Sequence, residues 1–371
     1  MSLESIIVLN PGSTACKISF FGLESEMPMI TKKVLWDVIK EQGLESVLEL
    51  KERSIVAIGF RWVHGGDIFR EPVRINDQHL PLLQSLNGLA PLHNPFAWNM
   101  LESLTAWYHE NKIELPCLYG VFDTAFHAYI PPFRREYDLP DELEKKYRIK
   151  RYGFHGIAVS SIVRQLPVFL GSLPKRLLVA HLGGGASVTA VLDGVSQQNS
   201  MGFTPLDGIP MVTRSGSIDP GVVLEILKRS DLDVHSLKRI LEEESGLYGM
   251  THEKDVAVIV NRYLAGDQVA IDALHLYTEK VAEMILGYTI YTEGLDALVF
   301  SGGIGEGSHV IRSLICKKLA HMGLILDRDA NEVATNKPRV ISAPDSSAGI
   351  YIFEPQEDRE IYVSGRQFWK K

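Results

Sequence analysis

The chain alternates between short apolar runs and longer stretches in which apolar residues recur with a helical period. Runs rich in β-branched and aromatic residues predict buried strands. Their alternation with helical stretches predicts an α/β fold. The expected strands are 6–9, 17–21, 55–60, 117–122, 177–180, 186–192, 297–300 and 350–353, with another near 340. The expected helices are 34–53, 79–110 with a break at 90–95, 222–292 with a break near 266, 309–322 and 357–369.

Three glycines at 183–185 form the turn between the strands 177–180 and 186–192. Backbone N–H groups in such a turn can point at a phosphate, because no side chain stands in the way. An ordinary hairpin turn is the simpler interpretation of a glycine cluster in isolation. Residues 8–22 repeat the pattern, with Asn10, Gly12 and Ala15 in the places of His181, Gly183 and Ala186. The repeat predicts two domains on one plan that face each other across a cleft, and chance similarity of two hairpins is the alternative.

Composition narrows the class of protein. With 371 residues the chain can form two domains, and its 45% hydrophobic and 23% charged content is that of a globular protein. A net charge of −8 argues against nucleic acid or an anionic membrane as the main partner. Cys16, Cys117 and Cys316 are far apart, and no apolar run reaches the roughly 20 residues of a membrane span. We therefore expect an enzyme of the reducing cytoplasm, with no nucleic-acid or membrane partner.

Two charged residues directly follow predicted strands. Arg61 comes after the run 55–60, and Asp123 comes after the run 117–122. In open α/β sheets the carboxyl ends of strands line the ligand crevice, so both are candidate site residues. Either one alone is better explained as a surface charge or a structural ion pair. His155 lies close to two glycines on irregular backbone, which favours a catalytic or anion-binding histidine.

Two further segments have the composition of binding loops. Residues 201–220 are apolar and rich in glycine, and they carry Arg214. Residues 301–308, SGGIGEGS, connect a predicted strand to a predicted helix, an arrangement that can hold an anion or a nucleotide. A plain strand-to-helix turn is the alternative, and neither the dinucleotide fingerprint nor a Walker A motif is present.

Together these residues resemble the acetate kinase (acetokinase) family, which also includes propionate and butyrate kinases. The matching stretches follow the order of the family along nearly the whole chain. They are NPGSTACK (10–17), FRWVHGG (60–66), APLHNP (90–95), VFDTAFH (121–127), KRYGFHG (150–156), HLGGGASVTAV (181–191), MGFTPLDGIPMVTRSGSIDP (201–220) and SGGIGEG (301–307).

The resemblance implies two βββαβαβα domains of the actin-like ATPase and sugar-kinase class, which is ribonuclease H-like. Residues 1–127, with a C-terminal helix at about 360–371, would form the N-terminal acyl-kinase domain. Residues 128–359 would form the C-terminal domain, which binds the nucleotide and dimerises. The resemblance also implies reversible, direct in-line transfer of the γ-phosphoryl group of ATP to a short-chain fatty acid. Acetate or propionate would give acyl phosphate and ADP, with Mg²⁺ as the metal, Mn²⁺ as a substitute, and a cytoplasmic homodimer as the assembly.

The resemblance assigns roles residue by residue. The catalytic set is Asp123, His155, Arg214 and Arg61, and the acyl pocket consists of Arg61, Val63, Leu92, His93, Phe154 and Pro205. Phosphate and nucleotide contacts are Asn10, Gly12, Ser13, Lys17, His181, Gly183, Gly184, Gly185, Asp255, Gly302, Gly303, Ile304 and Gly305. The metal ligands are Asn10 and Asp358, with Glu357 as the alternative to Asp358. Because a carboxylate and a triphosphate are both anions, two arginines suit the reaction as clamps.

The chain departs from the family pattern mainly on the nucleotide side. Ala15 stands where the family usually has serine, Gly184 where it has asparagine, and Ala257 where an arginine would clamp the purine. Residues 157–159 also differ. The metal-associated glutamate of the family, in a Pro-Thr-Asn-Glu-Glu segment, falls on Asp358, with Glu357 next to it as a substitute. Two alternatives therefore remain. The protein could be an acyl kinase that uses a different phosphoryl donor, or a relative that responds to the nucleotide but has lost turnover. A sugar or glycerol kinase is disfavoured, because it would need a carboxylate base rather than an arginine pair.

Overall fold

The computed structural model describes residues 4–12, 14–91, 93–335 and 337–370. The chain forms two compact units. Unit 1 comprises Met1–Ala128, His155–Ser161 and Gln356–Lys371. Unit 2 comprises Tyr129–Phe154 and Ile162–Pro355. The segments His155–Ser161 and 356–359 thus lie with unit 1, whereas the boundaries expected from the sequence assign both to the C-terminal domain.

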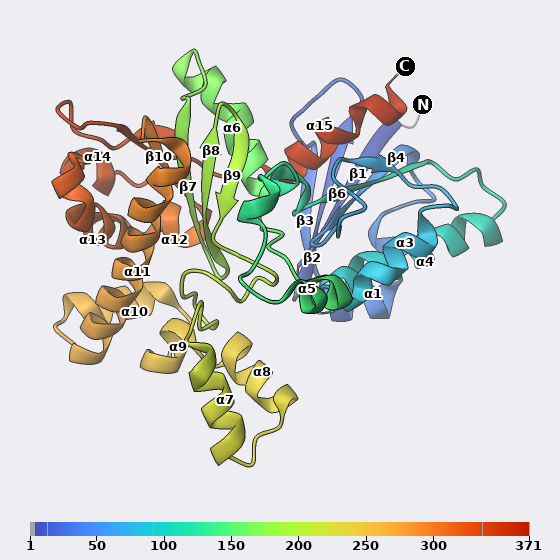
Figure 1. The fold of residues 1–371 in the computed structure, drawn as a ribbon. Coiled ribbons are helices and arrows are strands. Elements are labelled where there is room, and N and C mark those ends of the chain that lie inside the picture. The colour runs from blue at the N-terminus through green and yellow to red at the C-terminus, as the bar shows by residue number, and fades with distance from the viewer. Residues whose placement is uncertain (1–3, 13, 92, 336, 371) are drawn as a thin grey trace. The chain divides into compact units, whose positions relative to one another are not determined.

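Unit 1 contains a six-stranded sheet in the order β3-β2-β1-β4-β6-β5 (Figure 1). The strands are β1 Glu4–Pro11, β2 Ala15–Gly22, β3 Ile30–Leu35, β4 Ser54–Trp62, β5 Val73–Arg74 and β6 Cys117–Phe122. The strands β1, β4 and β6 run parallel to one another. The strands β2, β3 and β5 pair antiparallel with their neighbours. The carboxyl ends of three adjacent parallel strands therefore meet at one edge of the sheet.

Unit 2 contains a sheet of the same plan, in the order β11-β12-β10-β7-β8-β9. The strands are β7 Arg176–Leu182, β8 Ala186–Leu192, β9 Val195–Asn199, β10 Ala297–Ser301, β11 Arg339–Val340 and β12 Gly349–Ile352. The strands β7, β10 and β12 run parallel, and β8, β9 and β11 pair antiparallel, as their counterparts do in unit 1. The duplication predicted from the sequence is therefore present. Each sheet has a two-residue antiparallel edge strand, β5 or β11, beyond the five strands of a βββαβαβα domain. The strand expected near residue 340 is β11, whereas β3, β5 and β9 are not among the strands expected from the sequence.

The two glycine-containing turns differ in length by one residue. Pro11 pairs with Cys16 across the first turn, and Leu182 pairs with Ala186 across the second. The overlay of Ala15 on Ala186 made from the sequence is therefore off by one position, because the first turn is longer. In both turns the first glycine closes the turn with its N–H, from Gly12 to the carbonyl of Ala15 at 2.9 Å and from Gly183 to that of Gly185 at 3.0 Å.

Helices cover both faces of the unit 1 sheet, which explains why its central strands are apolar at nearly every position. The helices are α1 Trp36–Gln42, α2 Leu44–Val47, α3 Leu80–Ser85, α4 Asn94–Glu110 and α15 Glu357–Trp369, with 3-10 turns η1 Leu86–Gly88 and η2 Ala125–His127. The single helix predicted at 34–53 is wrong. Residues 30–35 form β3, and the rest divides at Gly43, whose φ of 79° ends α1.

The helices of unit 2 are shorter and more numerous than the sequence predicted. They are α5 Asp141–Tyr147, α7 Pro220–Arg229, α8 Val234–Glu243, α9 Gly246–Thr251, α10 Val256–Leu264, α11 Gln268–Thr292, α12 Gly302–Gly307, α13 His309–Leu319 and α14 Arg328–Glu332, with η3 Pro132–Arg134 and η4 Ala320–Met322. The helix α6 Gly156–Leu170 continues from unit 1 into unit 2. Aspartates at 219, 233, 255 and 267 begin four of them by accepting backbone N–H groups. The predicted loop at 301–308 is instead mostly the helix α12.

The long helix α11 packs against β7 and β8 and against α13 (Figure 1). Its buried side chains recur at helical spacing, which places one apolar face on the sheet. Within the described part of the chain, no helix combines the length and the apolar character needed to cross a membrane.

Candidate active site

Three polar side chains lie where the parallel strands of unit 1 end. Along β1, Ile6 and Val8 belong to the apolar cluster that α15 covers, whereas Ile7 and Leu9 face the opposite cluster. Because successive side chains alternate between faces, Asn10 continues the α15 side of β1. The same alternation places Arg61 after Ala57 on β4, and Asp123 after Tyr119 and Val121 on β6. Asn10, Arg61 and Asp123 therefore share one face at one edge of the sheet.

The guanidinium group of Arg61 connects these strand ends. Its Nε and Nη2 donate to the carboxylate of Asp123, with the shortest contact, Nη2 to Oδ2, at 2.7 Å. Its Nη1 donates to Oδ1 of Asn10 at 2.8 Å and lies 3.7 Å from Oε2 of Glu357. The side chain of Asp123 is 1% exposed and that of Arg61 is 15% exposed. Arg61 is thus a largely buried cation among carboxylates, with its orientation fixed by a bidentate pair.

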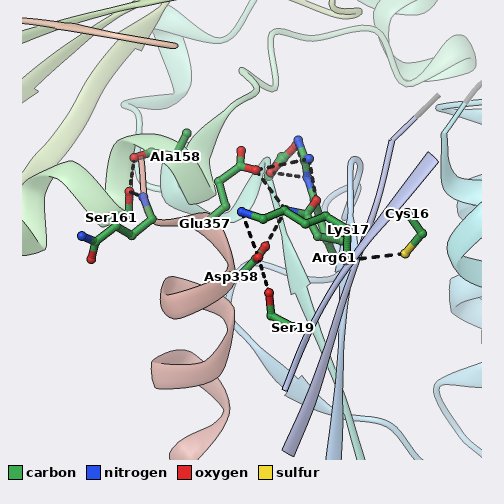
Figure 2. A network of polar contacts seen from close by, with 11 residues as sticks. Cys16, Lys17, Ser19, Arg61, Ala158, Ser161, Glu357 and Asp358 are labelled. Carbon is green, nitrogen blue, oxygen red and sulfur yellow. Dashed lines mark hydrogen bonds and ion pairs between the residues drawn. The ribbon is translucent and has the colours of Figure 1, made fainter. Parts of the chain in front are cut away.

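The first turn of α15 brings two carboxylates to the same place (Figure 2). Asn10 donates through Nδ2 to Oε2 of Glu357 at 3.0 Å and to Oδ1 of Asp358 at 2.9 Å. Oδ2 of Asp358 accepts from Ser19 Oγ at 2.6 Å and lies 3.0 Å from Lys17 Nζ. These contacts join residues that are more than 300 positions apart in the chain, and they fix both carboxylates next to Arg61.

Burial and charge act in opposite directions on the Arg61–Asp123 pair. Burial raises the pKa of Asp123 to about 6, although the charge and hydrogen bonds of Arg61 lower it. Burial also lowers the pKa of Arg61, but Asp123, Glu357 and Asp358 outweigh it and raise that pKa above its ordinary value. Arg61 therefore stays charged, whereas Asp123 takes up a proton as the pH falls through about 6.

His155 lies beside this group in unit 1 on strained backbone. Its φ is 60°, in the left-handed region that non-glycine residues rarely adopt. The N–H of the following Gly156 donates to the carbonyl oxygen of Asp123 at 2.9 Å. A Cβ at Gly156 would lie 2.1 Å from that oxygen, so only glycine fits. The glycine that marked His155 in the sequence is therefore what allows its turn to approach Asp123.

The other residues assigned to the acyl pocket are divided between the units. Val63, which is buried, and His93, which precedes the first turn of α4, belong to unit 1. Phe154, which is buried, and Pro205 belong to unit 2. Leu92, and Ser13 of the phosphate set, lie outside the described residues.

The glycine segments of unit 2 come together at the carboxyl ends of β7 and β10. Nδ1 of His181 lies 3.0 Å from Oγ of Ser301, the pair that corresponds to Asn10 and Arg61 in unit 1. Gly302 has a φ of 76°, and a Cβ there would lie 2.7 Å from the carbonyl oxygen of Leu182. Glycine at this position lets the start of α12 approach the end of β7. The turn 183–185 and the segment Gly302, Gly303, Ile304 and Gly305 are thus neighbours.

Arg214 lies on a turn that is docked on α8 and α9. Backbone N–H groups of Ser245 and Tyr248 donate to the carbonyls of Thr213 at 2.9 Å and Val212 at 2.7 Å, and the N–H of Ser215 donates to that of Leu241 at 3.0 Å. A Cβ at Gly246 would lie 2.2 Å from the carbonyl oxygen of Met211, so the close approach requires glycine. These bonds fix the position of Arg214 without using its side chain.

The guanidinium group of Arg214 has an unusual environment. Burial lowers the pKa of Arg214, although the negative charge of Glu242 acts to raise it. Its Nη1 lies 3.7 Å from the thioether sulfur of Met211, and it forms no ion pair with any carboxylate of the described residues. An unmet buried charge is costly, so a bound anion would stabilise this guanidinium group.

A cavity of about 510 Å³ borders the glycine segment of α12. Its lining includes Gly303, Glu306, Arg312, Arg339 and Glu354. Asp255 is absent from this lining. Its carboxylate instead accepts the N–H of Ala257 at 2.8 Å and begins α10, a local role that the sequence prediction did not consider.

The predicted metal ligands are Asn10 and Asp358, with Glu357 as the alternative to Asp358. Among the described residues, no three His, Cys, Asp or Glu side chains form a metal cage. Magnesium bound with a nucleotide usually takes only one or two carboxylates, because phosphate oxygens and waters complete its shell. Two adjacent carboxylates at the start of α15 fit that pattern. In this structure Oδ1 of Asn10 accepts from Arg61, and its Nδ2 orients both carboxylates.

Sequence reasoning missed several side chains that hold the site. Ser19 binds Asp358, and Asn199 binds Phe154. Asp207 accepts from Ser217 Oγ at 2.5 Å and forms an ion pair with Arg151 at 3.0 Å. These two contacts stabilise the loop that carries Pro205 and Arg214. The contacts of Ser19 with Asp358, of Asn199 with Phe154 and of Asp207 with Arg151 have no local signal, because the partners are far apart in the sequence.

Comparison with known proteins agrees with this geometry. A profile of the Acetokinase family matches residues 34–363. Acetate kinase of Pseudarthrobacter chlorophenolicus is 38% identical over 316 residues, which cover 84% of this chain and 80% of that protein. Acetate kinase of Clavibacter michiganensis subsp. michiganensis is 34% identical over 352 residues, covering 94% and 88%.

Solved structures agree as well. A propionate kinase from Francisella tularensis superimposes with a TM-score of 0.88 at 33% identity, over 98% of this chain and 99% of that one. Acetate kinase of Porphyromonas gingivalis gives a TM-score of 0.88 at 27% identity, over 99% and 100%. The resemblance inferred from the sequence and the two-domain α/β fold are confirmed.

Proposed function

Because the chain belongs to the acetokinase family, we propose that it transfers the γ-phosphoryl group of ATP to the carboxylate of acetate or propionate. A carboxylate oxygen of the acid would form the new O–P bond as the bond between the γ-phosphorus and the β–γ bridging oxygen breaks. The products are acyl phosphate and ADP, and the reaction is reversible.

The environment of Arg214 is the observation that carries this proposal. A partly buried guanidinium that pairs with no carboxylate in the described part of the chain matches the need of a phosphoryl transfer, in which charge builds on the transferred group. Arg61, held by Asp123, would supply positive charge at the acid, and His155 would donate to the transferred group. A nucleotide-responsive relative without turnover is not favoured, because a binding module needs none of this charge set.

The phosphate side of the proposal rests on backbone groups. The N–H groups of Gly184 and Gly185 and the side chain of His181 would hold phosphate oxygens, since the N–H of Gly183 already closes the turn. Lys17 and the turn at Gly12 would do the same in unit 1. The segment Gly302–Gly305 would border the nucleoside, next to the cavity of about 510 Å³. Glu357 and Asp358 would hold Mg²⁺, which supplies neutralising charge on the phosphates.

We also propose a cytoplasmic homodimer that forms through unit 2. Leu276, Leu286 and Ile290 are exposed apolar residues on α11. The groove beside them, about 560 Å³, is lined by further apolar residues that include Ile209, Ile218 and Met284. An exposed apolar surface of this kind is typical of a subunit contact.

A hydroxamate assay tests the reaction, because hydroxylamine converts an acyl phosphate to a coloured hydroxamate complex with iron. Acetate, propionate and butyrate are each combined with ATP, GTP or pyrophosphate in the presence of Mg²⁺. We expect product with acetate or propionate and ATP. If no pair of acid and donor gives product at millimolar acid, the protein is not an acyl kinase.

The pH dependence of turnover follows from the raised pKa of Asp123. As the pH falls through about 6, Asp123 takes up a proton and releases the bidentate hold on Arg61. We therefore expect kcat at saturating substrates to fall on the acid side with a midpoint near pH 6. In Asp123→Asn this acid limb should be absent and turnover low throughout. A wild-type midpoint near pH 4 would contradict the assignment.

Restoring a side chain at Gly184 should improve use of the nucleotide. A Cβ at Gly184 meets no atom within 4 Å, and its φ lies outside the left-handed region, so asparagine fits. Gly184→Asn adds an amide that can donate to a phosphate oxygen. We expect kcat/KM for ATP to rise about tenfold, because one hydrogen bond to a charged group contributes at least about 1.5 kcal/mol and a tenfold change corresponds to about 1.4 kcal/mol. Gly184→Ala is the control, and equal effects of the two substitutions would rule out the amide.

A further inference from the structure

Asn199, the last residue of β9, has an amide whose hydrogen bonds are all directed at buried partners. Its side chain is fully buried. Oδ1 accepts from the N–H of Phe154 at 3.2 Å and from that of Met201 at 3.0 Å. Nδ2 donates to the carbonyl of Phe154 at 3.2 Å and to Oγ1 of Thr189 at 2.8 Å. A single side chain thus makes four hydrogen bonds, and two of them go to the same residue.

The two bonds to Phe154 replace a missing strand partner. Residues 149–155 have no regular secondary structure, so the backbone groups of Phe154 have no ladder to join. Asn199 satisfies both its N–H and its carbonyl, as a neighbouring strand would. The N–H of Tyr152 donates nearby to the carbonyl of Gly202 at 3.0 Å. Asn199 therefore holds both polar groups of the Phe154 backbone, and the ring that this backbone carries is 1% exposed.

We propose that Asn199 is a positioning residue that determines which acid the enzyme prefers, by fixing the ring of Phe154. The inference rests on the proposed acyl-kinase function, in which Phe154 is a wall of the acyl pocket. Asn199 itself does not touch the substrate. Its bond to Met201 also fixes the start of the loop that carries Pro205, a second wall residue. Selection between acids that differ by one methylene depends on where the pocket-lining side chains lie. If the Phe154 ring is held less firmly, the pocket should therefore accept the longer acid more readily.

Asn199→Asp tests this with little change of shape. The aspartate carboxylate can still accept from the N–H groups of Phe154 and Met201. It lacks the N–H donor with which Asn199 binds the carbonyl of Phe154. The readout is the ratio of kcat/KM for propionate to that for acetate, which does not depend on the fraction of active protein. We expect the ratio to rise about five- to tenfold, with KM for ATP unchanged. Asn199→Ser, a smaller and neutral change, should shift the ratio in the same direction and serves if the aspartate variant does not fold.

Two controls separate positioning from general loss of stability. Thr292→Val removes a hydrogen bond of another fully buried side chain of unit 2, at the end of α11, where Oγ1 donates to the carbonyl of Gly294 at 2.6 Å. It should lower the unfolding temperature but leave the ratio unchanged. In a Phe154→Ala background, Asn199→Asp should add no further shift in the ratio.

The possible outcomes have distinct meanings. A ratio within twofold of wild type in a folded Asn199 variant overturns the inference, and so does a full shift that persists without Phe154. A wild-type protein that makes no acyl phosphate from any acid would instead overturn the proposed function.

Discussion

Replacing Arg214 by alanine should lower kcat about 1,000-fold and leave the unfolding temperature nearly unchanged. The activity loss is the effect of removing an arginine that stabilises a transferred phosphoryl group. Stability should hold because the turn of Arg214 is docked on α8 and α9 through backbone bonds. Its guanidinium forms no ion pair with a described residue, and burial lowers its pKa, so the cation is costly to the folded state. The measurements are kcat in the hydroxamate assay and thermal unfolding.

Arg239→Ala is a matched control for Arg214. Arg239 lies on α8, and its exposed side chain pairs with Glu244. Its loss should leave turnover unchanged, because exposed ion pairs contribute little. A kcat of Arg214→Ala within threefold of wild type would show that Arg214 has no part in the transfer.

Replacing Arg61 by alanine should remove both activity and stability. The change removes the guanidinium group that contacts the carboxylates of Asp123 and Glu357, while Lys17 still pairs with Asp358. Breaking a buried pair by removing one partner typically costs about 3–5 kcal/mol of the free energy of unfolding. The loss of kcat/KM for the acid should exceed about 1,000-fold, because Arg61 would neutralise the attacking carboxylate. Arg61→Lys should keep part of the stability but little activity, since lysine lacks the bidentate fork.

The stability loss of Arg61→Ala should depend on pH in a defined direction. Burial already raises the pKa of Asp123, and removing the cation raises it further. A group whose pKa is raised on folding stabilises the fold at low pH and loses that contribution as the pH rises through the folded value. Urea unfolding should therefore show a larger difference from wild type at pH 7.5 than at pH 5. Equal stability of the variant and wild type at pH 7.5 would contradict the buried pair.

The strands and the last helix could be predicted because their signals are local. The apolar run of β1 and the amphipathic pattern of α15 are complete within their own segments. The strand β3 was missed because its side chains alternate between exposed and half-buried positions at an edge, with no apolar run. The helix α12 was missed because four of its six residues are glycines, which disfavour a helix in isolation.

The site could be predicted only where one residue carries the signal. Arg61 and Asp123 follow strands directly, and the glycines beside His155 mark its turn. The positions of Ser19 and Asn199 depend on partners that only the folded chain brings near. Ser19 reaches Asp358 across 339 positions, and Asn199 reaches Phe154 across 45. Hydrogen bonds of this kind leave no pattern in the sequence around either partner.

The most direct test of the central claim is to observe the product itself. Purified protein is incubated with ATP, Mg²⁺ and acetate without hydroxylamine, and the mixture is followed by phosphorus NMR with Arg214→Ala in parallel. We predict that a new acyl phosphate resonance and ADP appear in equal amounts with the wild type, and that the variant gives neither at the same enzyme concentration. ADP with free phosphate and no acyl phosphate at any time would show hydrolysis instead of transfer to the acid, and would contradict the account.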